Sequence, residues 1–81
     1  MNYEEIDHWD YRLVNKEVAE EETVGIHEVY YNKDGYPVAC TENPVRVVGG
    51  NIAEALREVN LMLRACDKPI MYYNDINNSG G

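Results

Sequence analysis

The sequence NIAEALREVNLMLRAC, residues 51–66, is the most informative stretch of this chain of 81 residues, because it carries the clearest periodicity. At about 100° per residue, its apolar side chains fall on one broad stripe and its charged side chains fall away from that stripe. Asn51 is a favourable N-cap with Glu54 three positions later, and Pro69 marks the end. The stretch is therefore expected to form an amphipathic α-helix with a stripe of Ile52, Ala55, Leu56, Val59, Met62, Leu63 and Cys66.

One apolar residue of this helix does not belong to the stripe. Leu61 lies about 180° from the middle of the stripe by the same turn angle. Two interpretations are open: an ordinary isolated leucine on the surface, or an anchor for a partner or a second copy of the chain.

The residues before the helix predict three antiparallel strands, at 11–18, 24–31 and 36–41, because aromatic and β-branched residues are frequent there. The tetrapeptide NKDG at 32–35 predicts a tight turn between the second and third strands. Closing this turn is expected to place Tyr31 opposite Tyr36, Val29 opposite Val38, and His27 opposite Cys40.

Together these elements predict an α+β fold, in which a three-stranded antiparallel sheet packs against one long helix in the order βββα. A short final strand could follow at 70–73. We expect a flexible N-terminal segment at 1–10, a single domain at 11–73, and a disordered polar tail at 74–81.

Both faces of the predicted hairpin are rich in apolar and aromatic residues, although one helix can cover only one face. The other face must be covered by the chain's own ends or by another molecule, unless its tyrosines lie half exposed, which tyrosine tolerates. The sequence therefore gives Tyr30, Tyr31, Tyr36 and Leu61 as candidate protein-binding residues, and a homodimer as one form of the complex.

The net charge of −8 is concentrated near the N-terminus. Residues 1–28 hold nine acidic and two basic residues, a net charge of −7, against −1 for the remainder. Such a field disfavours direct binding of nucleic acid and favours a basic protein partner, or else it only keeps the protein soluble. Because the acidic N-terminus has no apolar run and no stretch approaches about 20 apolar residues, we expect a cytoplasmic protein without membrane contact.

No cluster of residues predicts catalysis. His27 and Glu28 are adjacent on a strand and point to opposite faces, so His27 with Cys40 is expected to be a packing pair rather than a zinc site. Cys40 and Cys66 are expected to be buried thiols, which could form a disulfide only if the fold brings them close together. We therefore expect no enzyme activity, no cofactor and no metal.

The hairpin followed by GNIAEAL, residues 50–56, resembles HicB-like antitoxin domains over roughly residues 11–72. That resemblance implies two or three antiparallel strands, a helix, and a last short strand after a proline. The sequence departs from the family in having CTENPVRVVGG where a Pro-Gly-Cys turn is usual, and in lacking the family's C-terminal DNA-binding element. Operator binding is therefore not implied.

The stretch GIHEVYYNKDG at 25–35 followed by TENPV at 41–45 is also similar to a family of short acidic bacterial proteins that have no assigned activity. The sequence thus predicts a non-enzymatic, acidic protein-binding module of HicB-like architecture from a bacterium. Two alternatives stay open, namely a phage-type acidic inhibitor that mimics the charge of nucleic acid, and a small metal-dependent hydrolase.

Overall fold

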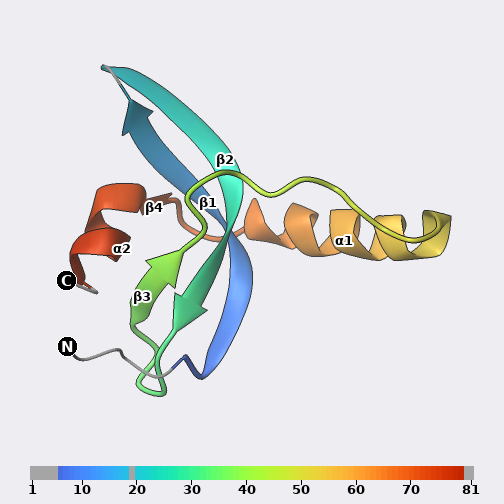
Figure 1. The fold of residues 1–81 in the computed structure, drawn as a ribbon, viewed down its shortest axis with the longest axis horizontal. Coiled ribbons are helices and arrows are strands. Elements are labelled where there is room, and N and C mark those ends of the chain that lie inside the picture. Colours follow the sequence, from blue (N-terminus) through green and yellow to red (C-terminus); the bar gives the residue numbers. More distant parts are fainter. Residues whose placement is uncertain (1–5, 19, 80–81) are drawn as a thin grey trace.

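The computed structural model describes residues 6–18 and 20–79, and residues 1–5, 19, 80 and 81 lie outside the described part. Six elements follow one another along the chain (Figure 1), which are β1 (His8–Val18), β2 (Glu21–Tyr31), β3 (Pro37–Cys40), α1 (Ile52–Ala65), β4 (Met71–Tyr72) and α2 (Tyr73–Ser79). The α+β class predicted from the sequence is confirmed. In the described residues, no helix is both long enough and apolar enough to cross a membrane.

The sheet has four strands in the order β3-β2-β1-β4, and β4 runs parallel to β1 while the other neighbours are antiparallel. The prediction of a three-stranded, purely antiparallel sheet is therefore wrong in detail. The short final strand pairs through only two positions, with Met71 opposite Val14 and Tyr72 opposite Asn15. The sequence thus located this strand within 70–73, but its parallel pairing with β1 depends on tertiary contacts.

The hairpin of β1 and β2 is longer than predicted, because its ladder runs from His8 opposite Tyr31 to Val18 opposite Glu21. Residues 8–10, expected in the flexible N-terminal segment, begin β1, and β2 begins at Glu21, three residues before its predicted start at residue 24. Figure 1 shows this hairpin curling away from the other elements at the end that joins the two strands.

The turn at 32–35 forms as predicted, with the Asn32 side-chain oxygen accepting hydrogen bonds from the backbone N–H groups of Asp34 and Tyr36, both at 3.0 Å. Gly35 supplies the left-handed position with φ of 86°. The expected register of β2 and β3 is wrong by one residue at Tyr31, because the turn closes with the Asn32 N–H bonded to the Tyr36 carbonyl oxygen, and a bulge at residues 30–31 adds a second residue to the shift. The observed partners are Val29 and Cys40, Tyr30 and Ala39, and Tyr31 and Pro37.

One face of the sheet is covered by α2, and we call it the α2 face. Ile76 of α2 is 1% exposed and packs with Val14, Val29 and Tyr31 in one core cluster. The tail at 74–81, expected to be disordered, thus contains a helix that covers the sheet. Only Gly80 and Gly81 of that tail lie outside the described residues.

The opposite face, the α1 face, is covered by the C-terminal end of α1. Met62 and Ala65 pack on Tyr11 of β1, with Ile26 and Val45 at the border of this second core cluster. The predicted cap at the start of α1 is present, because the Asn51 side chain accepts a 2.9 Å hydrogen bond from the Glu54 N–H. Figure 1 shows that the rest of α1 projects sideways from the sheet, so the helix does not lie across it as predicted.

Candidate functional site

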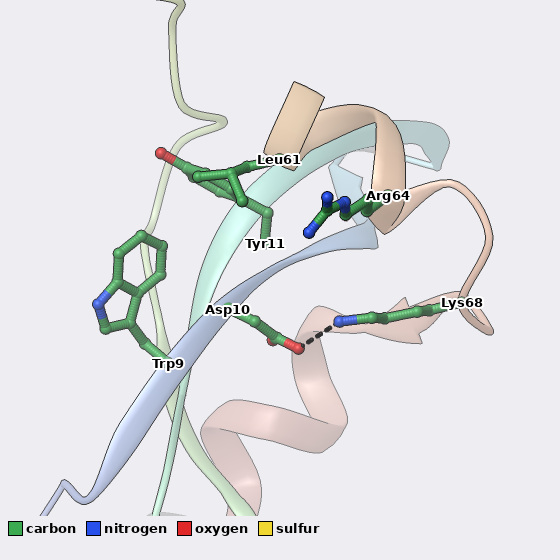
Figure 2. A pocket seen from close by; sticks show the side chains of 6 residues that line it. All are labelled: Trp9, Asp10, Tyr11, Leu61, Arg64 and Lys68. Atoms are coloured by element: carbon green, nitrogen blue, oxygen red, sulfur yellow. Dashed lines mark hydrogen bonds and ion pairs between the residues drawn. The ribbon is translucent and has the colours of Figure 1, made fainter. Parts of the chain in front are cut away.

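The candidate site is an open cavity of about 400 Å³ where β1 meets the C-terminal end of α1. Three consecutive residues of β1 line it, and three residues from α1 and the segment after it complete the wall. Figure 2 shows Trp9 on one side of the cavity and the two basic side chains on the opposite side. The lining residues are Trp9, Asp10, Tyr11, Leu61, Arg64 and Lys68.

Two aromatic rings form the apolar part of the cavity. Trp9 and Tyr11 lie two positions apart on β1, so both point to the α1 face, and their rings meet edge to face with centroids 5.1 Å apart. Trp9 is 47% exposed and Leu61 is 37% exposed. Tryptophan, tyrosine and arginine are the residue types enriched in the hot spots of protein interfaces, and Trp9, Tyr11 and Arg64 all line this cavity.

The charged part of the cavity is held in place by an ion pair. Lys68 Nζ lies 2.8 Å from Asp10 Oδ2, and the other carboxylate oxygen of Asp10 accepts a 2.8 Å hydrogen bond from the Tyr31 hydroxyl. Arg64 adds a second positive charge to the lining. The lining therefore holds two cations and one carboxylate, and Arg64 offers a group that can bind a ligand carboxylate.

The hydroxyl of Tyr11 fixes α1 to the sheet by donating a hydrogen bond to Glu58 Oε1. Burial of the Tyr11 ring, followed by this bond to a carboxylate, raises the pKa of Tyr11 to about 12. Tyr11 is therefore a neutral hydrogen-bond donor at any physiological pH. Its role is to hold the cavity wall in place.

The outer edge of β1 beside the cavity has no paired strand before Val14, although the chain after α1 contacts it through Lys68 with Asp10 and through Pro69 with Arg12. Among the described residues, β4 pairs only with Val14 and Asn15, so residues 8–13 have no strand neighbour on that side. Unpaired backbone N–H and C=O groups on such an edge can pair with an added strand. The cavity thus lies next to a stretch of backbone that can bind an extended segment.

The four candidate residues from the sequence do not form one surface. Leu61 lines the cavity, and Tyr30 lies opposite Trp9 in the ladder, with its hydroxyl donating a 2.7 Å hydrogen bond to Glu28. That bond and burial raise the pKa of Tyr30 to about 12. Tyr36 is 66% exposed in the turn and does not line the cavity.

Tyr31 is the candidate that the fold removes from the surface. It is 8% exposed on the α2 face, and its ring stacks on His8 with centroids 4.9 Å apart. Its hydroxyl donates to Asp10 and accepts a 3.2 Å hydrogen bond from Arg12. Burial, with the hydrogen bond to Asp10, raises the pKa of Tyr31.

Sequence reasoning did not find Trp9, Arg64 or Lys68. A signal for two of them exists, because Leu61, Arg64 and Lys68 follow one another at intervals of three and four, the spacing of one helix face. Lys68 lies beyond the last residue of α1, where the chain still turns in the same sense. The contribution of Trp9 could not be found this way, because it depends on how the helix meets β1.

The histidine and cysteine residues do not assemble as the sequence suggested. His27 is 1% exposed, lies opposite Arg12 in the ladder, and has Nδ1 2.8 Å from the carbonyl oxygen of Thr41, whereas Cys40 lies opposite Val29. The predicted pairing of His27 with Cys40 is therefore wrong. Both cysteines are free thiols. Burial raises the pKa of Cys40. Cys66 is exposed, whereas the sequence predicted a buried thiol there.

Within the part of the chain that the structure describes, no group of three or more His, Cys, Asp or Glu side chains could hold a metal ion. No protein-family model, curated protein or solved structure matches this chain.

Proposed function

We propose that this protein is a non-enzymatic, cytoplasmic protein-binding module that docks a partner protein at the cavity between β1 and α1. The observation that carries the proposal is the exposed pair of Trp9 and Leu61 beside the open edge of β1. The order of three strands, a helix and a short final strand supports keeping the resemblance to HicB-like domains as part of the proposal.

The chemistry of the cavity specifies the segment of the partner that binds there. An extended segment adds to the edge of β1 and places an apolar side chain against Trp9 and Leu61. A carboxylate next to that side chain meets Arg64 and Lys68. The rest of the partner is basic, because the joining end of the β1–β2 hairpin is acidic and exposed at Glu17, Glu20, Glu21 and Glu22.

The test compares two matched variants on the same helix. Leu61→Glu places a charge in the cavity, and Leu56→Glu makes the same change about 140° around α1 and outside the cavity. Proteins captured by the wild type are purified and titrated against each variant. We expect a partner that binds the wild type and Leu56→Glu equally and binds Leu61→Glu at least tenfold more weakly.

Trp9 is the only tryptophan in the chain, so its fluorescence reports on the cavity directly. Burial of its half-exposed ring by the partner should shift its emission to shorter wavelength, and the backbone amides of residues 8–13 should gain protection from hydrogen exchange. The proposed docking site would be refuted if every purified partner bound Leu61→Glu as tightly as the wild type and left the Trp9 emission unchanged.

The exposed glutamates favour a second candidate function, that of an acidic inhibitor which mimics the charge of nucleic acid. Four glutamates lie at one projecting end of the hairpin, as phosphates lie along a nucleic-acid strand. This candidate predicts that affinity for a nucleic-acid-binding protein falls steeply with salt and is lost when these glutamates become glutamines. Binding that is independent of salt would exclude it.

A further inference from the structure

An exposed apolar stripe runs along α1 outside the cavity. Ile52, Leu56, Val59 and Leu63 are 80%, 57%, 43% and 64% exposed, although they belong to the stripe that the sequence predicts to be buried. The residues of α1 that reach the sheet are Met62 and Ala65, together with Glu58. The exposed stripe is centred about 120° away from that contact on the helix.

The spacing of the stripe is that of a helix–helix seam. Its residues follow at intervals of four, three and four, which are the intervals between the a and d positions of a heptad repeat. At about 100° per residue, all four charged side chains of α1 lie more than about 100° from the centre of the stripe. This half of the helix therefore presents no charge to a second helix.

The stripe is also complementary to itself. The intervals read the same in both directions, so a two-fold axis between Arg57 and Glu58 would bring Ile52 opposite Leu63 and Leu56 opposite Val59 of a second copy. In this antiparallel arrangement the two sheets lie at opposite ends of the helix pair. The sheet is attached at the C-terminal end of α1, and the chain between β3 and α1 runs back past the projecting part (Figure 1), where the stripe nevertheless stays exposed.

The surface area of the chain fits this arrangement. The accessible surface is 6031 Å², whereas the mass of 9.3 kDa gives about 5,000 Å² for a compact monomer by the usual scaling. The projecting part of α1 and the projecting end of the β1–β2 hairpin both contribute to this excess of about 1,000 Å² (Figure 1). The radius of gyration of 13.4 Å likewise exceeds the about 11.7 Å expected for 81 residues.

We propose that the protein forms a homodimer in which two α1 helices pair antiparallel through Ile52, Leu56, Val59 and Leu63. Pairing also explains how the projecting turns stay helical, because an isolated helix of about 14 residues is only marginally stable in water. The dimer extends the protein-binding role to a second surface and does not depend on the cavity, whose lining residues lie on another side of the helix.

Light scattering after size exclusion tests the dimer from micromolar to millimolar concentration. We expect the wild type to reach twice the 9.3 kDa monomer mass, and Leu56→Glu to dissociate at least tenfold more readily. Leu61→Glu is the matched control and should dimerise like the wild type. Leu56 is 57% exposed in the single chain, so its variant should remain folded, which circular dichroism verifies.

Disulfide cross-linking tests the orientation in a Cys66→Ser background. A mixture of Ile52→Cys and Leu63→Cys chains should cross-link on oxidation, whereas Ile52→Cys alone should not. A wild type that is monomeric at every concentration, or a Leu56→Glu variant that dimerises as tightly as the wild type, would overturn the proposal. Efficient cross-linking of Ile52→Cys alone would overturn the antiparallel arrangement. If Leu61→Glu loses partner binding but remains a dimer, the cavity and the stripe on α1 are independent binding surfaces.

Discussion

Replacing Ile76 with alanine should release α2 from the sheet and destabilise the whole domain. Ile76 is 1% exposed and packs against Val14, Val29 and Tyr31. The change removes three carbon atoms at about 0.8 kcal/mol each, or about 2.5 kcal/mol from transfer alone. A residual cavity would add to this, and comparable substitutions cost about 2–5 kcal/mol.

This cost is large for a domain of 81 residues, because natural domains are stable by only about 5–15 kcal/mol. At about 4–8 °C per kcal/mol for chains of this size, the melting temperature should fall by about 10–20 °C. A helix of seven residues cannot persist without its packing, so helical circular dichroism should also fall. Urea unfolding followed at 222 nm and by Trp9 fluorescence measures both effects.

The matched control is Ile6→Ala, since Ile6 is 53% exposed and loses the same atoms. Its free energy of unfolding should change by less than about 0.5 kcal/mol. If Ile76→Ala unfolds at the wild-type urea midpoint, α2 contributes nothing to the core, and residues 74–81 behave as the free tail that the sequence predicted.

Three further outcomes follow from single contacts. Asn51→Ala removes the side-chain cap of α1 and should cost about 0.5–2 kcal/mol, seen as lost signal at 222 nm. Glu22→Lys should stabilise the hairpin by about 0.2–1 kcal/mol in urea unfolding, because Glu17 and Glu22 lie directly opposite each other. Tyr11 and Tyr30, with pKa values raised from 10.0 to about 12, should ionise late in an ultraviolet titration. Because the folded state keeps these protons longer than the unfolded state, their stabilisation is complete below pH 10 and is lost as the pH rises through 12.

Local signals in the sequence predicted local structure well. The N-cap at Asn51 and the turn at 32–35 each depend on side chains that bond to backbone groups two to four residues away, so composition alone places them. The predicted register of β2 and β3 was wrong by one residue at the turn, which Asn32 and Tyr36 close, and by one more at the bulge at residues 30–31. Nothing in the residues of the turn specifies that shift.

The helix α2 was not predictable, because YNDINNS contains no apolar period and three asparagines that favour turns. It exists because Ile76 inserts into the core and Tyr73 packs beside it, with the Lys16 ammonium 4.4 Å from the centre of the Tyr73 ring. Only part of the cavity could be predicted from the sequence. Helical spacing places Leu61, Arg64 and Lys68 on one side, whereas the contribution of β1 depends on the tertiary fold.

The stripe on α1 shows where sequence periodicity stops being informative. Periodicity establishes that one side of a helix avoids water, but it does not identify what covers that side. Here Met62 and Ala65 already pack the helix against the sheet. The core of the single domain therefore does not use the other apolar residues of the stripe, which are Ile52, Leu56, Val59 and Leu63. A small domain retains such residues at the cost of solubility unless they are buried in an assembly. The same pattern that predicts the helix therefore argues for its second copy.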